Sequence, residues 1–297
     1  MNKDVLPGVW PALAFGSNVD DLVYLEGLKR SSKGCLPSES IELLYSECLR
    51  ILEEGYTGKM LKIRLPYGLT ATIPDTQLPE AWANILHVFC YRDYARFEDF
   101  TPDYGWVVVD VGAYLGFYTL WAGVHVGDSG LVVAVEPNPT AREILLSNVS
   151  LNRGRIGRIA FDPRLVCGSP GIRRLYVTGY WATSSIVRSY AEHMGDIEDT
   201  ILVPCTTLDE LFEDHNLEHI DLLKLDVEGA EEEVLATPTV CPKKVARIVV
   251  EVHPPWAKAE RLAKLLHSRG YRVDIIAPSE LEHQVFVYAI ASNQHVQ

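Results

Sequence analysis

The sequence predicts an α/β fold built on a largely parallel, doubly wound sheet, with an extension in front of it. After Pro102, apolar runs alternate with amphipathic stretches, which is typical of strands and helices that follow one another in βαβ units. The length of 297 residues suits one large α/β domain with an extension. Hydrophobic residues at 47% and charged residues at 23% exclude a wholly disordered or low-complexity chain.

The larger part of the chain is expected to hold seven strands and five helices. The apolar runs that predict strands are 106–111, 131–135, 159–166, 220–225, 246–252, 272–276 and 284–289. Apolar residues at helical spacing predict helices at 115–126, 140–152, 208–215, 229–236 and 256–269. Because helices between parallel strands cover the sheet, we expect helices on both of its faces.

Residues 1–100 are predicted to form an N-terminal extension or cap, and residues 101–297 the main domain. Apolar residues between positions 41 and 52 recur at helical spacing, which predicts a helix. Residues 60–73 alternate around Tyr67 and Gly68, which predicts a hairpin. The extension is expected to cover part of a substrate cleft.

Charge and hydropathy argue against two kinds of partner. The 27 Lys and Arg residues against 40 Asp and Glu residues give a net charge of −13, so binding of nucleic acid is not expected. No apolar run approaches the roughly 18–20 residues that a membrane-spanning helix needs. The apolar stretch 5–15 is broken by Pro7 and Pro11, so no signal peptide is expected either.

The six cysteines show no C-x-x-C and no paired spacing, so neither a zinc site nor a disulfide framework is expected. Reduced, mostly buried thiols are predicted instead. With no signal peptide expected, the predicted location is the cytoplasm. The cysteines are Cys35, Cys48, Cys90, Cys167, Cys205 and Cys241.

A turn with two glycines follows the first strand of the predicted sheet. The strand ends at Asp110, and Gly112 and Gly116 stand four residues apart before a helix. Glycines in such a turn let a ligand approach the backbone closely. The segment lacks the full G-x-G-x-x-G and G-K-[ST] patterns, so it does not indicate a pyrophosphate or triphosphate. A carboxylate at Asp110 suits a ligand with positive charge, such as a sulfonium.

A second carboxylate follows the next strand. Glu136 lies 24 residues beyond Gly112, close to the spacing at which a carboxylate accepts hydrogen bonds from both ribose hydroxyls. The alternative is that Asp110 and Glu136 only cap helices after strands. Together the two motifs favour a nucleoside-containing ligand.

These residues resemble the S-adenosylmethionine-dependent methyltransferases with a Rossmann-like fold, and more narrowly the FkbM family, over about residues 85–290. Members of that family are mostly O-methyltransferases that act on sugars and other natural-product hydroxyls. Tyr114 departs from the family, which commonly has a small polar residue at this position. The blocks that carry the resemblance are Asp110-Val-Gly-Ala113, Glu136-Pro-Asn138-Pro, Ser147-Asn-Val-Ser-Leu-Asn152, Thr207-Leu-Asp209-Glu-Leu and Leu223-Lys-Leu-Asp226-Val-Glu228-Gly229-Ala-Glu231.

The resemblance implies S-adenosylmethionine as cofactor and a set of residues around it. Glu136 and Asn138 would hold the ribose and its surroundings, and the adenine would lie near Val166 or Cys167. The residues implied around the methionine moiety are Asp110, Gly112, Ala113 and Gly116.

Four ionisable residues are expected to meet at one edge of the sheet. Asp226 and Glu228 follow one buried strand, and Glu251 and His253 alternate onto one face at the end of the next. His253 is the natural base for a hydroxyl, because its pKa lies near neutrality. A histidine with a purely structural role is the alternative. Metal-free chemistry is expected, although these four residues would also suit Mg²⁺ or Mn²⁺.

The expected reaction is O-methylation of a hydroxyl on a sugar, glycolipid or other small natural product. The aromatic segment 180–185 is either a sugar platform or a packed loop. An arginine-rich stretch at 153–174 raises the hypothesis of an anionic acceptor. Three alternatives stay open: an N-methyltransferase, an NAD(P)-dependent oxidoreductase and a non-catalytic binding protein.

Overall fold

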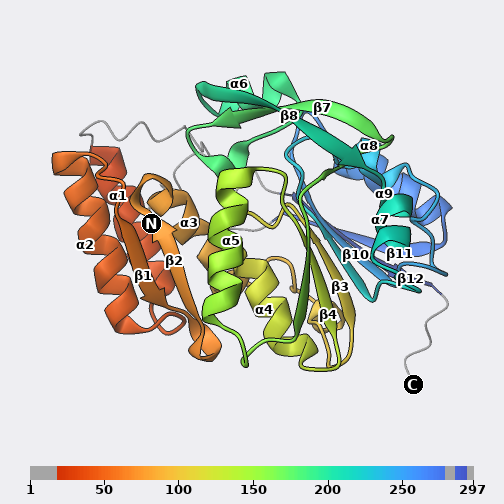
Figure 1. Ribbon diagram of the computed structural model, residues 1–297, viewed down its shortest axis with the longest axis horizontal. Coiled ribbons are helices and arrows are strands. Elements are labelled where there is room, and N and C mark those ends of the chain that lie inside the picture. The colour runs from red at the N-terminus through yellow and green to blue at the C-terminus, as the bar shows by residue number, and fades with distance from the viewer. Residues whose placement is uncertain (1–18, 278–284, 293–297) are drawn as a thin grey trace, which may run out of the picture.

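A seven-stranded sheet forms the centre of the computed structural model, which describes residues 19–277 and 285–292 (Figure 1). β12 runs antiparallel to both of its neighbours, and the other adjacent strands are parallel. The predicted α/β fold with a largely parallel sheet is confirmed. In the order β11-β12-β10-β9-β3-β4-β5, the strands are β11(Tyr271–Ile276), β12(Val285–Ala291), β10(Arg247–Val252), β9(Leu222–Leu225), β3(Val107–Val111), β4(Leu131–Val135) and β5(Arg158–Asp162).

One predicted strand proves to be two. The run 159–166 is divided into β5 and β6(Leu165–Val166), because Pro163 has no N–H group with which to continue a ladder. β6 pairs instead with β8(Ile197–Thr206), which also pairs with β7(Gly171–Thr178) in a three-stranded sheet. β7 and β8 were not among the strands predicted from the sequence. In Figure 1 these two strands lie across the top of the molecule.

Helices cover both faces of the main sheet, as predicted. Alternate strand residues enter two separate hydrophobic clusters: Val108 and Val132 lie in one, and Val109 and Val133 in the other. The first cluster includes α4(Phe117–Val126) and α5(Pro139–Leu151). The second includes α7(Leu208–Asp214), α8(Glu231–Leu235) and α9(Ala259–Ser268). A further helix, α6(Arg188–Met194), follows β7.

The N-terminal extension contains the predicted helix and hairpin, and two helices that were not predicted. It packs beside α5 (Figure 1). A single hydrophobic cluster joins Trp82 to Trp121 and Leu145. Of the helices in the described ranges, none is both long and apolar enough to span a bilayer. The domain boundary near residue 100 stays a prediction. The elements are α1(Val19–Ser32), α2(Ser38–Glu54), β1(Met60–Arg64), β2(Thr70–Pro74), α3(Leu78–Ile85) and the π-helical turn η3(Leu86–Tyr91) that continues α3.

Two asparagines, Asn148 in α5 and Asn152 at its C-cap, dock the hairpin onto this helix. The Asn148 side chain accepts a hydrogen bond from the Thr72 amide at 2.7 Å and donates to the Thr72 carbonyl at 3.2 Å. Asn152, one turn later, does the same with Thr70, at 2.9 and 2.7 Å. Each side-chain amide therefore replaces the backbone of a neighbouring strand at the edge of β2. These asparagines belong to one of the blocks that carry the family resemblance.

The prediction that the cysteines are reduced and unpaired is wrong for four of the six. Cys35 is bonded to Cys90, and Cys167 to Cys205. The partners are 55 and 38 residues apart, so no spacing pattern reveals them, and only the packing of η3 against the segment after α1 and of β6 against β8 brings them together. Disulfides are rare in cytosolic proteins, so the cysteines do not support the predicted cytoplasmic location.

Candidate active site

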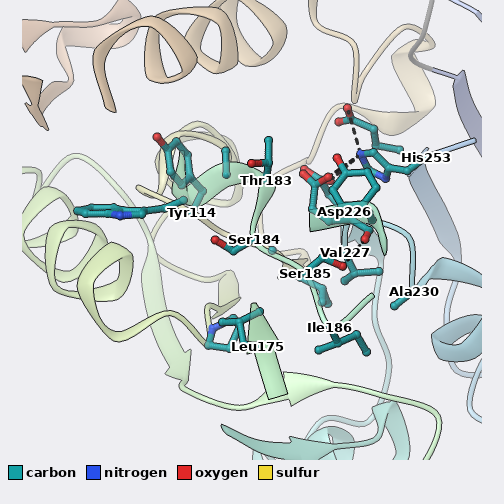
Figure 2. A pocket seen from close by; sticks show the side chains of 18 of the residues that line it. Tyr114, Leu175, Thr183, Ser184, Ser185, Ile186, Asp226, Val227, Ala230 and His253 are labelled. Atoms are coloured by element: carbon teal, nitrogen blue, oxygen red, sulfur yellow. Dashed lines mark hydrogen bonds and ion pairs between the residues drawn. The ribbon is translucent and has the colours of Figure 1, made fainter. Parts of the chain in front are cut away.

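A cavity of about 430 Å³ lies at the ends of β3, β4, β9 and β10. This volume is in the range of small-molecule sites, and the carboxyl ends of parallel strands are where such sites form. Figure 2 shows Tyr114 on one side of the cavity and Asp226 and His253 on the other. The segment between β7 and α6, with Thr183 and Ser185, lies between them. Trp181, Ser184 and Ser185, from the predicted aromatic loop, thus reach the cavity.

The glycine turn after β3 lies against the end of β9. Gly112 has a φ of +79°, and a Cβ atom there would lie 1.9 Å from the carbonyl oxygen of Asp226. Gly116, with a φ of +89°, precedes α4, and its Cβ would lie 3.2 Å from Leu145. Gly112 therefore allows two strand ends to meet at the cavity, whereas Gly116 allows α4 to pack closely against α5.

Glu136 is held by the backbone at the wall of the cavity. One carboxylate oxygen accepts from the Tyr114 amide at 2.7 Å, and the other from the Asn138 amide at 2.8 Å. Burial raises the pKa of Glu136 to about 7, although these two N–H groups act in the opposite direction. Each oxygen keeps a lone pair for a further donor, so the geometry suits two adjacent hydroxyls.

The structure places the predicted cofactor residues in two groups. Gly112, Glu136 and Val166 line the cavity. The others are not among the described residues that line it; Asn138 caps α5 by accepting from the Thr140 amide at 3.0 Å, and Cys167 is in a disulfide. The predicted cofactor residues that do not line the cavity are Asp110, Ala113, Gly116, Asn138 and Cys167.

A buried lysine joins the two strand ends. The Lys224 ammonium lies 3.3 Å from Asp110 and 3.4 Å from Asp226, and donates to the Gly112 carbonyl at 2.7 Å. Burial alone would lower the pKa of Lys224, but the Asp110 and Asp226 carboxylates outweigh it and raise that pKa. Asp110 also accepts from the Thr119 hydroxyl at 2.6 Å and is fully buried. Asp110 thus acts beneath the site, by fixing Lys224.

The four predicted catalytic residues meet at the cavity. His253 Nε2 lies 3.2 Å from Glu228, 3.8 Å from Asp226 and 3.9 Å from Glu251. Its Nδ1 atom lies 2.6 Å from Glu231, which is fully buried. Burial would lower the pKa of His253, but Glu228 and Glu231 outweigh it and hold that pKa well above its usual value. These carboxylates therefore favour the protonated imidazole.

Burial has the opposite effect on the carboxyl groups of this cluster. It raises the pKa of Glu228, and the neighbouring His253 cation only partly offsets that rise. The same cause raises the pKa of Glu251. Glu228 also has a φ of +54°, a backbone conformation that residues other than glycine rarely adopt. Its carbonyl accepts from the Ser185 hydroxyl at 2.6 Å, which helps to hold that conformation.

Three residues of the site were not predicted from the sequence, and two of them, Tyr94 and Tyr190, had no signal there. The Tyr94 hydroxyl donates to Glu251 at 2.5 Å and to Asp226 at 3.1 Å, although Tyr94 lies 132 residues before Asp226. Tyr190 packs edge-on against His253, with ring centroids 5.4 Å apart. Glu231 belongs to the most specific block of the resemblance, so that motif was the available signal for it.

The positions of the side chains suit a bound cation better than a bound anion. Asp226, Glu251 and His253 each offer one atom, and these atoms lie within 4.8 Å of one another, as a shared cation would require. Of the six arginines at 153–174, Arg164 lines the cavity, and it already pairs with Asp162 at 2.6 Å and Asp214 at 2.7 Å. The geometry therefore gives little support to an anionic acceptor.

Comparison with known proteins gives a family match. Residues 110–273, more than half of the chain, match the model of the methyltransferase FkbM domain. The chain is 27% identical over 237 residues to the 31-O-demethyl-FK506 methyltransferase FkbM of Streptomyces tacrolimicus, which covers 71% of this chain and 88% of the relative.

Two further similarities are more limited. The AMB antimetabolite synthetase AmbE of Pseudomonas aeruginosa is 28% identical over 274 residues, covering 77% of this chain and 12% of that protein. The crystal structure of the methyltransferase FkbM from Methylobacillus flagellatus KT is similar with a TM-score of 0.46 and 13% identity. That similarity covers 91% of this chain and 59% of the other.

Proposed function

Because this chain belongs to the FkbM family of S-adenosylmethionine-dependent methyltransferases, we propose that it O-methylates a hydroxyl of a sugar, glycolipid or other small natural product. The observation that carries the proposal is the meeting of two features in one cavity. A nucleoside cradle at Gly112 and Glu136 opens onto a cluster of proton-handling groups around Asp226 and His253. A hydroxyl acceptor needs both, because its oxygen must face the methyl group and lose a proton.

The residues at the cradle fit S-adenosylmethionine. Glu136 offers carboxylate lone pairs to the ribose hydroxyls, and the Gly112 backbone leaves room that a Cβ would fill. Val166 is buried at the cavity wall and suits an adenine ring. When bound, the cofactor supplies a methyl group on a positively charged sulfur. The carboxylates of Asp226 and Glu228 favour that charge.

Glu228 is the proton acceptor that the electrostatics favour. A base works best when its pKa lies near the working pH, and burial raises the pKa of Glu228 in that direction. Glu231 favours the cationic form of His253, and that cation lowers the pKa of Glu228 against the larger effect of burial. Tyr94 holds Glu251 and Asp226 in place from the extension. Glu228 thus accepts the proton, and His253, Asp226 and Glu251 set its electrostatic surroundings.

The test measures formation of S-adenosylhomocysteine with a panel of hydroxylated small molecules, followed by NMR identification of the methylated atom. With an accepted substrate, Glu228→Gln should lower kcat by roughly 10²–10⁴ and leave cofactor affinity unchanged. His253→Gln removes the cation that lowers the pKa of Glu228, so the pH–rate profile should move to higher pH. If His253→Gln is inactive at every pH while Glu228→Gln stays active, His253 is the base. A methyl group found on nitrogen would replace O-methylation with N-methylation.

A further inference from the structure

One wall of the cavity comes from the N-terminal extension. Glu80, Asn84 and His87 line it from α3 and the start of η3, and all three occupy one side of the helix at spacings of four and three residues. Glu80 and His87 are 3% and 4% exposed. The mechanism above uses none of them. Three polar side chains in a row are unusual on a helix face that is otherwise packed against a core.

Glu80 has an unused hydrogen-bonding atom. Its Oε2 atom is buried and has no hydrogen-bond partner among the described residues. A buried polar atom without a partner is costly, which points to a partner that a bound ligand supplies. Burial also raises the pKa of Glu80 well above its usual value, which favours the protonated carboxyl, a group that can donate as well as accept.

His87 adds a donor at the other end of the row. Its Nδ1 atom lies 2.7 Å from Asp93, so Nε2 is the nitrogen left for a ligand. Burial would lower the pKa of His87, but Asp93 outweighs it and raises that pKa. The Asn84 side chain, between Glu80 and His87, offers both a donor and an acceptor.

Aromatic rings line another part of the cavity. Tyr190 and Trp256 meet edge to face with centroids 5.0 Å apart, and Trp181 lies on the segment after β7. The Trp181 amide donates to Gln77 at 2.9 Å, so this segment is tied to the start of α3. Polar groups for the hydroxyls of a ring, together with aromatic faces for its C–H surface, are the combination that a carbohydrate requires.

Charge decides between neutral and anionic carbohydrates. The carboxyl groups that line the cavity are Glu80, Glu136, Asp226, Glu228 and Glu251. Basic side chains also line the cavity. Arg164 pairs with Asp162 and Asp214, and His253 pairs with Glu228 and Glu231. A phosphate would therefore lie close to the Asp226 and Glu251 carboxyl groups, while the Arg164, His253 and His87 side chains at the cavity already pair with carboxylates.

We propose that Glu80, Asn84 and His87 form the acceptor subsite, and that it takes a neutral, polyhydroxylated ring such as a glycosyl group. The proposal rests on the O-methylation proposed above and names its substrate class. It also gives the extension a role in specificity. The ring hydroxyls hydrogen-bond to the row of polar side chains, while the hydroxyl to be methylated faces Asp226 and Glu228.

The test measures binding to the enzyme loaded with S-adenosylhomocysteine. Methyl α-D-glucopyranoside and methyl α-L-rhamnopyranoside are titrated by ligand-observed NMR, with glucose 6-phosphate as the anionic comparison. Glu80→Leu and Asn84→Ala should each weaken glycoside binding about tenfold. Glu80→Gln should bind like the wild type, since an amide can make the hydrogen bonds of a protonated carboxyl. Glu53→Leu, on the exposed side of α2, is the matched control and should change nothing.

Each outcome separates the two proposals. If the glycosides bind as described but no S-adenosylhomocysteine forms with S-adenosylmethionine, the subsite stands and O-methylation of these rings fails. If glycosides are methylated while Glu80→Leu and Asn84→Ala bind them normally, the reaction stands and the subsite is overturned. The proposal is also overturned if glucose 6-phosphate binds more tightly than the glycosides, or if neither glycoside binds.

Discussion

Replacing Lys224 with methionine tests the buried charge triad beneath the site. The change removes the ammonium that faces Asp110 and Asp226, and leaves Asp110 fully buried without its counterion. Asp226 borders the cavity and can be hydrated, so the main penalty falls on Asp110. Breaking a buried ion pair by removing one partner typically costs about 3–5 kcal/mol.

Protonation of Asp110 sets a limit on that penalty. From an unfolded-state pKa of about 3.9, protonating an aspartate costs about 1.4 kcal/mol per pH unit, which is about 4 kcal/mol at pH 7 and about 1.5 kcal/mol at pH 5. In the variant the folded-state pKa of Asp110 lies above the unfolded value, so stability is lost as pH rises. The difference in unfolding free energy between wild type and Lys224→Met should therefore grow from pH 5 to pH 7.

Urea unfolding followed by tryptophan fluorescence at pH 5, 6 and 7 measures this difference. The double variant Lys224→Met/Asp110→Asn removes the buried charge and should recover more than half of the loss at pH 7. Lys264→Met makes the same chemical change at an exposed position of α9 and should stay within about 0.5 kcal/mol of wild type. A loss that does not depend on pH, or a double variant no more stable than the single one, would refute the charge argument.

Three further predictions concern the cofactor, the extension and a metal. Glu136→Ala should weaken S-adenosylmethionine binding by about 1.5–3 kcal/mol, as measured by calorimetry. It should also abolish the rise in affinity that is expected between about pH 6 and pH 8 in the wild type, where the Glu136 carboxyl ionises. Unchanged affinity would show that Glu136 does not bind the ribose. Asn148→Ala should lower the free energy of unfolding by about 2–3 kcal/mol, because it leaves both backbone groups of Thr72 without their partner. Ser147→Ala, at an exposed position of the same helix, should change it little. Equal losses in the two variants would contradict the docking role of Asn148. Treatment with EDTA should leave activity intact; loss that Mg²⁺ or Mn²⁺ restores would make Asp226, Glu251 and His253 ligands.

The main sheet was accessible from sequence because its signals are local. Buried parallel strands are short apolar runs, and the helices between them show an apolar face, so each element carries its own pattern. The strands β7 and β8 carry no such pattern. Most residues of β7, and all residues of β8 from Ile197 to Leu202, are exposed or half-buried. Helices α1 and α3 were missed for another reason. The apolar residues of α1 show little helical periodicity, and α3 has only 8 residues, which is short of the roughly 11–18 residues over which a helical pattern is recognised.

The sequence by itself determined the chemistry at the strand ends, and only the tertiary structure decided how those groups act on one another. Asp226, Glu228, Glu251 and His253 could be expected at one edge, because the ends of adjacent parallel strands must meet there. The protonation of these four groups could not be predicted, because it depends on burial and on Glu231 and Tyr94, whose positions follow from packing. The same holds for the disulfides and for the wall that α3 supplies to the cavity. Contacts between distant segments leave no periodicity in a single sequence, whereas strands and helices do.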